Sequence, residues 1–141
     1  MEIAYDKKTL ISLLNKNSSS VRGLIPTMGN LHKGHLDLVY RSTLDCAYTV
    51  VTIFVNPLQF GPNEDFHKYP RTIEEDIGIL KESNVDLVFA PSIKEMYGED
   101  KAEQVIVAVT SLSEILCGKN RPGHFDGVTT VVAKLLNLLS Q

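Results

Sequence analysis

The chain has 141 residues, a length typical of one domain, and its 43% hydrophobic and 22% charged residues are typical of a globular protein rather than a disordered one. The formal net charge is -3 and the 14 lysines and arginines are scattered, which argues against nucleic acid and favours a small-molecule partner. Apolar runs are too short to span a membrane, no secretory signal opens the chain, and there are only 2 cysteines. We therefore expect a cytoplasmic protein with no membrane contact and no cysteine-based metal site.

Segments in the first part of the chain alternate between helix and strand. Asp6 is a good N-cap for a short helix that places leucines on one face. Residues 21–26 predict an apolar strand, and a second helix follows the turn at residues 27–30. The run YTVVTIFV over residues 48–55 is β-branched and aromatic without polar alternation, which is typical of a central strand covered on both faces. We expect these two strands to be parallel.

The alternation continues after a long loop that is rich in proline and glycine. Thr72 and Glu75 have the spacing of a capping box at the start of a helix. Residues 85–90 predict a third strand, and residues 104–110 predict a fourth. Strands that alternate with helices indicate one α/β domain over residues 1–141, a Rossmann-like doubly wound parallel sheet whose ligand crevice lies at the carboxyl ends of the strands.

The last predicted helix, over residues 126–139, is strongly apolar and includes Val131 and Val132. The chain stops at Gln141 without a further strand to which this helix could lead. We therefore expect the sequence to be truncated.

The connection between the first apolar strand and its helix carries residues suited to phosphate. Residues 26–35 read PTMGNLHKGH, in which Gly29 and Gly34 allow a close backbone approach and the helix N-terminus presents N–H groups to an anion. His32 and His35 can donate hydrogen bonds to phosphate oxygens and titrate near neutrality. The loop therefore predicts a phosphate site, although it has neither a P-loop nor a dinucleotide fingerprint. Two surface histidines or an adventitious metal pair are the alternatives.

The connection after the second strand carries two amides. Residues 54–62 read FVNPLQFGP, in which Asn56 and Gln59 offer donors and acceptors suited to a carboxylate or hydroxyl, and apolar neighbours can wall a pocket. Parallel strands place this segment next to the histidine loop. The pattern predicts a site for a small acid, and a plain Asn-Pro turn with Gln59 in solvent is the alternative.

A third segment, NRPGHFDG over residues 120–127, leads into the last helix. Arg121 could meet an anion near the helix N-terminus. A capping turn explains Gly123 and Asp126 equally well, and His124 is more often a structural hydrogen-bonding residue than a catalyst.

Three acidic residues, Glu74, Glu75 and Asp76, open the helix after Thr72. We interpret them as carboxylates that interact favourably with the helix dipole, with a metal-binding role as the lesser alternative. Tyr69 could lie over a ligand site, and the alternative is that its segment is only the loop that leads into the helix.

Together these motifs resemble the pantothenate synthetase (pantoate–beta-alanine ligase) family. The similarity runs through PTMG, HKGH, IFVNPLQFG, YPRT, MY and RPGHFDGV and covers nearly the whole chain. The paired-histidine motif is shared with the wider nucleotidylyltransferase superfamily, whereas the FVNPLQF and RPGHFDGV segments are typical of this family.

The resemblance implies a reaction in two steps. Pantoate attacks the α-phosphate of Mg-ATP to give pantoyl adenylate and pyrophosphate, and beta-alanine then displaces AMP to form pantothenate. The residues that would line the ATP site are Met28, Gly29, Asn30, Leu31, His32, Lys33, Gly34 and His35. Within this set His32 and His35 would contact the phosphates, with His35 as the proton donor.

The resemblance also implies a substrate pocket. Gln59 would bind pantoate and the incoming beta-alanine, and Asn56 would shape the same pocket. Pro26 and Thr27 are expected there too, and Val131 and Val132 would wall the pantoate methyl groups. The expected partners are ATP, pantoate and beta-alanine with Mg²⁺, and the enzyme is a possible homodimer.

Members of the family continue with another strand, a further ATP-binding loop and a small C-terminal domain, so the chain resembles the N-terminal domain alone. Two other interpretations remain open at this point. One is a different nucleotidylyltransferase with the same His-x-x-His loop, and the other is a non-catalytic module that binds a nucleotide or pantoate.

Overall fold

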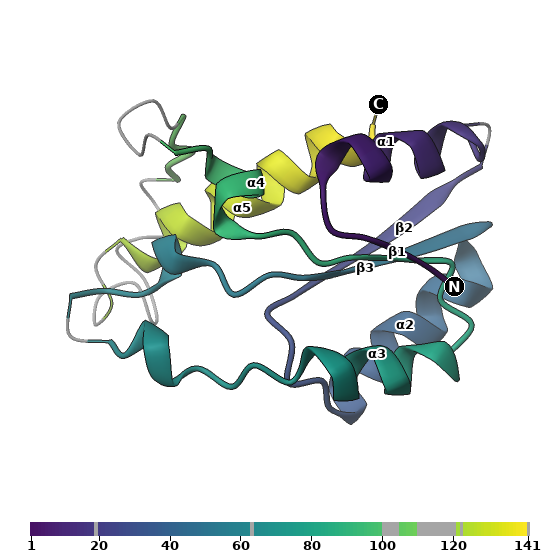
Figure 1. Cartoon of the computed structure of the whole chain (residues 1–141), viewed down its shortest axis with the longest axis horizontal. Helices are drawn as coiled ribbons and strands as arrows, with labels where there is room; N and C mark the ends of the chain where they lie inside the picture. Colours follow the sequence, from purple (N-terminus) through teal and green to yellow (C-terminus); the bar gives the residue numbers. More distant parts are fainter. Residues whose placement is uncertain (19, 63, 100–104, 110–120, 122, 141) are drawn as a thin grey trace.

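The computed structural model of the chain describes residues 1–18, 20–62, 64–99, 105–109, 121 and 123–140 (Figure 1). In this described part a parallel four-stranded sheet has the order β1-β4-β3-β2. The strands are β1 (Glu2–Ala4), β2 (Arg22–Thr27), β3 (Tyr48–Ile53) and β4 (Leu87–Phe89). The helices are α1 (Lys7–Asn15), α2 (Lys33–Asp45), α3 (Ile73–Lys81), α4 (Ile93–Tyr97) and α5 (His124–Leu139), with 3₁₀ turns η1 (Pro57–Gln59) and η2 (Phe66–Lys68).

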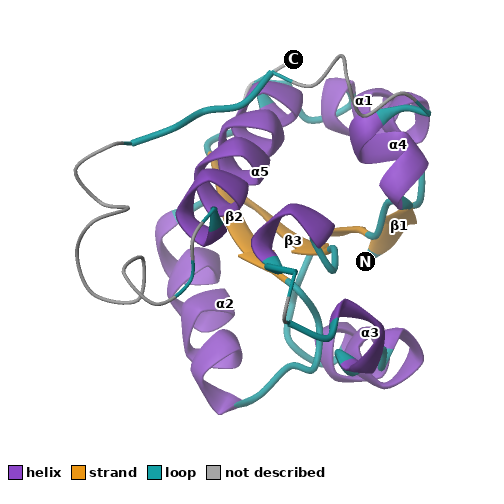
Figure 2. Ribbon diagram, turned by 90° about the vertical axis from the view of Figure 1, so that its left-hand side faces the viewer, coloured by secondary structure: helices purple, strands orange, loops and turns teal. Residues whose placement is uncertain are grey.

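Helices cover both faces of the sheet, as expected for a doubly wound fold. Both views show α1, α4 and α5 on one face and α2 and α3 on the other (Figures 1 and 2). Each residue of β3 is buried, and its side chains alternate between two cores. Val50 packs with the α1 and α5 side, whereas Val51 packs with the α2 and α3 side. The prediction of a central strand covered on both faces is confirmed.

The helix predicted after Asp6 is also confirmed, because the Asp6 carboxylate accepts the Thr9 N–H at 2.8 Å and caps α1. Arg22 from β2 then ties the ends of two helices together. Its guanidinium donates to the carbonyl of Leu14 at 2.9 Å and to the carbonyl of Leu139. These bonds hold the end of α5 against α1 and help to fix α5 across the sheet.

The fourth strand predicted over residues 104–110 is wrong for the part that the structure describes. Residues 105–109 form no strand, and Val105 is 80% exposed. The Val107 N–H instead donates to Thr130 Oγ1 on α5 at 2.9 Å. The sheet edge beside β4 is taken by β1, which was not predicted from the sequence, and residues 104 and 110 lie outside the described part.

The capping box predicted at Thr72 is wrong as well. Thr72 is the N-cap of α3 but makes no side-chain capping bond, and its hydroxyl donates to Asp76 Oδ2 at 3.0 Å. Its backbone angles, φ -117° and ψ 37°, differ from the extended conformation of an ordinary N-cap. The Thr72 hydroxyl thus contacts the Asp76 carboxylate rather than an N–H group of the first turn. None of the described helices is long and apolar enough to cross a membrane.

Candidate functional site

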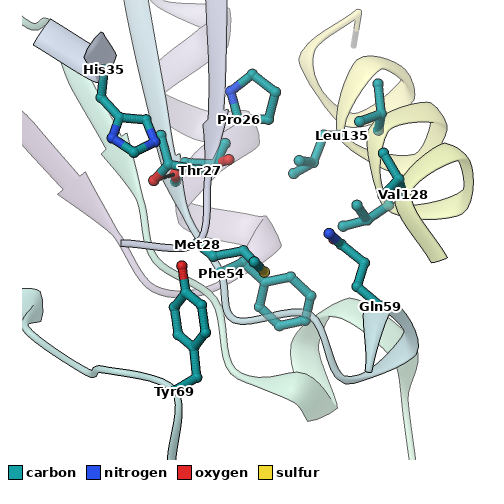
Figure 3. A pocket seen from close by; sticks show the side chains of 12 residues that line it. Pro26, Thr27, Met28, His35, Phe54, Gln59, Tyr69, Val128 and Leu135 are labelled. Carbon is teal, nitrogen blue, oxygen red and sulfur yellow. Dashed lines mark hydrogen bonds between the residues drawn. The ribbon is translucent and has the colours of Figure 1, made fainter. Parts of the chain in front are cut away.

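A cavity of about 310 Å³ opens where β2 and β3 end (Figure 3). From the β2 side it is lined by Pro26, Thr27 and Met28, and from α2 by His35. Gln59 of η1 lies on the other side of the close-up from His35. The histidine loop and the segment of the two amides therefore meet at one cavity, at the small end of the range for ligand pockets.

The far wall of the cavity is apolar and comes mainly from α5. Val128, Val131, Val132 and Leu135 line it, and Phe54 from the end of β3 adds an aromatic surface. Two successive turns of one helix thus present branched aliphatic side chains to the same space. This wall suits the aliphatic body of a small molecule rather than its charged groups.

The two histidines form a reciprocal cap at the start of α2. His32 Nδ1 accepts the Gly34 N–H at 3.1 Å, and His35 Nδ1 accepts the His32 N–H at 3.3 Å. A ring nitrogen that accepts a hydrogen bond does not donate one, so Nε2 is the nitrogen of each ring that is left to donate. The cap therefore fixes Nε2 as the donor of both rings.

The electrostatic surroundings favour the neutral form of His35. Partial burial lowers the pKa of His35 below its ordinary value, and the neighbouring His32 lowers it further. The carboxylate of Asp76 acts in the opposite direction on this pKa. The ring centroids of the two histidines are 4.0 Å apart, a separation at which two positive charges would repel strongly.

Asp76 holds the loop between β2 and α2 in place. Its side chain is 2% exposed and accepts the N–H groups of Asn30 at 3.0 Å and Leu31 at 2.8 Å. Gly29 and Asn30 both have positive φ, and a Cβ on Gly29 would lie 2.9 Å from Asp76 Oδ2. Asp76 lies in the first turn of α3, as predicted, and its carboxylate has the further role of binding the turn of the histidine loop.

Thr27 secures the start of the same loop. Its hydroxyl donates to the carbonyl of Thr52 at 2.7 Å and accepts the Gly29 N–H at 3.1 Å. The loop is thus held from β3 as well as from α3. The described residues contain no group of three or more His, Cys, Asp or Glu side chains that could hold a metal ion.

Asn56 lies behind the cavity rather than in its wall. It is fully buried, and its Nδ2 donates to Gln59 Oε1 at 2.9 Å and to the Gly127 carbonyl at 3.0 Å. Its Oδ1 accepts the Leu58 N–H at 3.2 Å and the Tyr97 hydroxyl at 2.7 Å. Because Gln59 Oε1 already accepts from Asn56, the Nε2 group of Gln59 remains to donate into the cavity.

The RPGHFDG segment attaches α5 to η1. His124 Nδ1 donates to the Gln59 carbonyl at 2.8 Å, and Arg121 Nε donates to Glu64 Oε1 at 2.5 Å. The Arg121 bond lowers the pKa of Glu64. Arg121 therefore pairs with a carboxylate of this chain.

The remaining predicted residues surround the cavity without lining it. Asn30, Leu31, His32, Lys33 and Gly34 belong to the loop and first turn of α2, and the exposed Lys33 pairs with Asp37 at 3.3 Å. Gly29 lines a neighbouring cavity of about 290 Å³ on the other side of Phe54. Sequence reasoning missed Thr52, Val128 and Leu135 in the wall of the main cavity, and it missed the supporting role of Tyr97.

The geometry agrees with the comparisons to known proteins. The family model for Pantoate-beta-alanine ligase matches residues 2–141. This chain belongs to that family. It is 52% identical over 139 residues to the pantothenate synthetase of Acetivibrio thermocellus, a match that covers 99% of this chain and 48% of that protein. The chain spans about half the length of the curated relatives it matches.

Solved structures of the pantoate–beta-alanine ligase family share the fold. Pantothenate synthetase from Thermus thermophilus superposes with a TM-score of 0.89 at 46% identity, covering 99% of this chain and 49% of that one. The ligase from Francisella tularensis, solved in complex with beta-gamma ATP and beta-alanine, has the same TM-score at 40% identity and covers 99% and 53%. The predicted Rossmann-like nucleotidylyltransferase fold and the resemblance to this family are both confirmed.

Proposed function

We propose that residues 1–141 form the nucleotide- and pantoate-binding domain of a pantoate–beta-alanine ligase. The enzyme would condense pantoate with beta-alanine at the expense of ATP, by way of pantoyl adenylate. Family membership supports this function, as does the Francisella tularensis relative solved with beta-gamma ATP and beta-alanine. The observation that carries the proposal is the single cavity between the His35 ring and the Gln59 amide.

In the first step we propose that pantoate lies along the α5 wall. Its methyl groups would contact Val131 and Val132, and Gln59 Nε2 would donate a hydrogen bond to one of its oxygens. A carboxylate oxygen of pantoate then attacks the α-phosphorus of ATP, and the bond from that phosphorus to the bridging β-oxygen breaks. Pyrophosphate leaves with the electron pair of that bond.

The histidine cap would serve the phosphates in this step. With Nδ1 occupied, His32 and His35 present neutral Nε2–H donors beside the N-terminus of α2, which favours negative charge. Positioning and hydrogen bonding, rather than proton transfer from an imidazolium, would then lower the barrier. This refines the role of proton donor expected for His35.

In the second step the amine of beta-alanine attacks the carbonyl carbon of pantoyl adenylate. The carbon–oxygen bond to the phosphate breaks, AMP leaves, and the nitrogen loses a proton as the amide forms. Gln59 would remain beside the acyl group during this exchange. The pocket residues stay in place because Asn56, His124 and Gly127 fix η1 against α5.

Mg²⁺ would arrive as the ion carried by the ATP phosphates. The described residues offer no cage of protein ligands for it, and Mg²⁺ commonly binds through nucleotide phosphates and water. None of the described residues lining the cavity is a lysine or an arginine.

We also propose that the enzyme is located in the cytoplasm and forms a homodimer. Sedimentation of the purified enzyme tests the dimer.

The test uses a chimaera in which this chain replaces the matching half of the Acetivibrio thermocellus synthetase. Pyrophosphate release should require both ATP and pantoate, and pantothenate should form only when beta-alanine is added. A folded chimaera that binds both ligands without releasing pyrophosphate would favour the non-catalytic module. Release that is independent of pantoate but requires another acceptor would favour a different nucleotidylyltransferase.

Substitution of Gln59 by Ala in this chimaera tests the pocket itself. The KM for pantoate should rise far more than the KM for ATP, because the amide faces the acid and the histidine cap is untouched. An equal rise in both values would contradict the assignment of Gln59 to pantoate.

A further inference from the structure

Thr52 has a buried hydroxyl with no hydrogen-bond partner in the described part of the chain. The residue is 0% exposed and lies on the central strand β3. Its carbonyl accepts from Thr27, but its Oγ1 has no partner. Buried polar atoms in folded proteins are almost always paired, so an orphaned one requires an explanation.

The other buried threonines among the described residues are satisfied. Thr27 Oγ1 has two partners, Thr49 Oγ1 lies 2.9 Å from Ser42 Oγ, and Thr130 Oγ1 accepts the Val107 N–H at 2.9 Å. The buried side chains of Asn56 and Asp76 are also paired. Among the polar residues of the described part that are buried as a whole, Thr52 is therefore the one whose side chain lacks a hydrogen-bond partner.

The strand directs the Thr52 side chain toward the main cavity. Val50 and Phe54, two residues away on either side, belong to the core that contains Val131 and Leu135 of α5. Because side chains alternate along a strand, Thr52 faces α5 as well. It lines the cavity, and its register partner on β2 is Pro26, which lines the same cavity.

An unpaired hydroxyl at this position destabilises the ligand-free protein. Valine has nearly the same shape as threonine, and β3 already carries valine at positions 50 and 51. Replacing an unpaired buried hydroxyl by an apolar group of the same shape is neutral or stabilising. Stability of the fold therefore does not explain why position 52 has a threonine rather than a valine. A ligand that supplies the missing hydrogen-bond partner would explain it.

We propose that the Thr52 hydroxyl binds an alcohol group of the hydroxy acid in the cavity and so selects hydroxylated acids over purely aliphatic ones. This inference rests on the proposed function, in which the acid is pantoate. An alcohol both donates and accepts, so it can pair with the threonine oxygen in either sense. The surrounding Pro26, Phe54 and Leu135 offer such a group no other hydrogen bond from their side chains.

Thr52→Val in this chain tests the proposal by two measurements. Thermal unfolding of the ligand-free protein should occur at the same temperature as wild type or higher, because no bond is lost. Pantoate affinity, from NMR titration, should fall roughly 10- to 100-fold, because the alcohol of the ligand is left unpaired. Affinity for tert-butylacetate, which has the same carbon skeleton and carboxylate but no hydroxyl, should be unchanged.

Two further variants act as controls. Thr52→Ser keeps the hydroxyl and should restore most of the pantoate affinity. Thr49→Val removes a paired hydroxyl from the opposite face of β3, so it should lower the unfolding temperature and leave pantoate affinity unchanged.

Several outcomes would overturn the inference. Unchanged pantoate affinity in Thr52→Val would show that the hydroxyl does not meet the ligand, and a lowered unfolding temperature would show that it has a partner within the protein. An equal loss of affinity for both acids would assign it to the carboxylate instead. If the wild-type chain binds neither acid, the proposed function fails and this inference fails with it, whereas normal wild-type binding with an unaffected Thr52→Val overturns the inference alone.

Discussion

At the scale of single residues, occupied hydrogen-bond positions decide what each polar side chain can offer a ligand. The Nδ1 atoms of His32 and His35 accept backbone N–H groups, which leaves their Nε2–H donors. The Oε1 atom of Gln59 accepts from Asn56, which leaves the amide nitrogen. The proposed site therefore offers hydrogen-bond donors that can bind carboxylate and phosphate oxygens.

His35→Ala in the chimaera should reduce pyrophosphate release by about 100-fold or more, the range for loss of one preorganised donor. His67→Ala is the matched control, since His67 is exposed on η2 and lies outside the cavity wall. Near-normal adenylate formation in His35→Ala would contradict the proposed role of the cap.

The lowered pKa of His35 predicts a stability change with pH. Unfolding releases the ring from burial and from His32, so the unfolded chain takes up a proton at a higher pH than the folded one. The contribution of His35 to stability should be complete above the ordinary histidine pKa of about 6.5 and should fall as pH decreases through the lower folded-state value. As pH falls through this range, the free energy of unfolding of His35→Asn, measured by urea titration, should decrease less than that of wild type. Parallel plots of unfolding free energy against pH for the two proteins would contradict the prediction.

Individual site residues were predictable from sequence only where the signal is local. The paired histidines and Gln59 follow their strands directly, so motif and position were enough to bring them to one place. Asn56 was expected in the pocket, but its four hydrogen bonds come from three separate elements and turn it away. The acidic cluster marked Asp76 but not its contact with the histidine loop, and no motif marks Thr52, because both roles depend on which face of the helix or strand is buried.

At the scale of elements, the contact between η1 and α5 keeps the Gln59 side of the cavity in position. Gly127 allows this approach, because a Cβ there would lie 2.3 Å from the Leu58 carbonyl oxygen. His124 adds a bond to the Gln59 carbonyl from the same helix. The two segments most typical of the family therefore form one packing unit.

Gly127→Ala should lower the free energy of unfolding by about 1–3 kcal/mol, the usual cost of overpacking. Gly78→Ala on α3 is the matched control, since a Cβ at position 78 would meet nothing within 4 Å, and it should stabilise the helix by about 0.5–1 kcal/mol. Urea unfolding of both variants makes the comparison. Equal effects in both helices would show that the η1 contact does not limit position 127.

Tyr97→Phe tests the support of Gln59 from α4. Burial raises the pKa of Tyr97 to about 12, so its hydroxyl is protonated at neutral pH and donates to Asn56 Oδ1. Without this bond Asn56 holds Gln59 less firmly, and the KM for pantoate in the chimaera should rise roughly 3- to 10-fold while the KM for ATP stays constant.

The control for this variant is Tyr40→Phe, in which the tyrosine is 66% exposed on α2 and distant from η1. A fall in kcat for both tyrosine variants, without a change in the KM for pantoate, would contradict a positioning role for Tyr97.

Elements were predicted well where every residue of the segment is buried. They were predicted poorly where contacts with distant segments determine the structure. The six residues of β3 are all buried, which gave an unmistakable apolar run. The three residues of β1 are too few to show a pattern, yet they pair with β4 along their whole length. Residues 105–109 have strand composition, but they pair with no strand of the described part, and the Val107 N–H donates to Thr130 of α5 instead.

At the scale of the whole molecule, the doubly wound sheet explains why one cavity collects residues from distant segments. Parallel strands end at one edge, so the loops after β2 and β3 meet there, and α5 returns across the same face (Figure 2). Arg22 fixes the other end of α5 by bonds to the carbonyls of Leu14 and Leu139. The site is thus supported at both ends of its longest wall.

The central claim is that a small hydroxy acid binds between the ends of β2 and β3 and α5, with the Gln59 amide as a donor. The most direct test is an NMR titration of the isotopically labelled chain with pantoate. We predict that the largest chemical-shift changes occur at the Gln59 side-chain amide and at the methyl groups of Val131 and Val132. Changes centred instead on the surface between Tyr40 and Leu44, with Gln59 unmoved, would contradict the account.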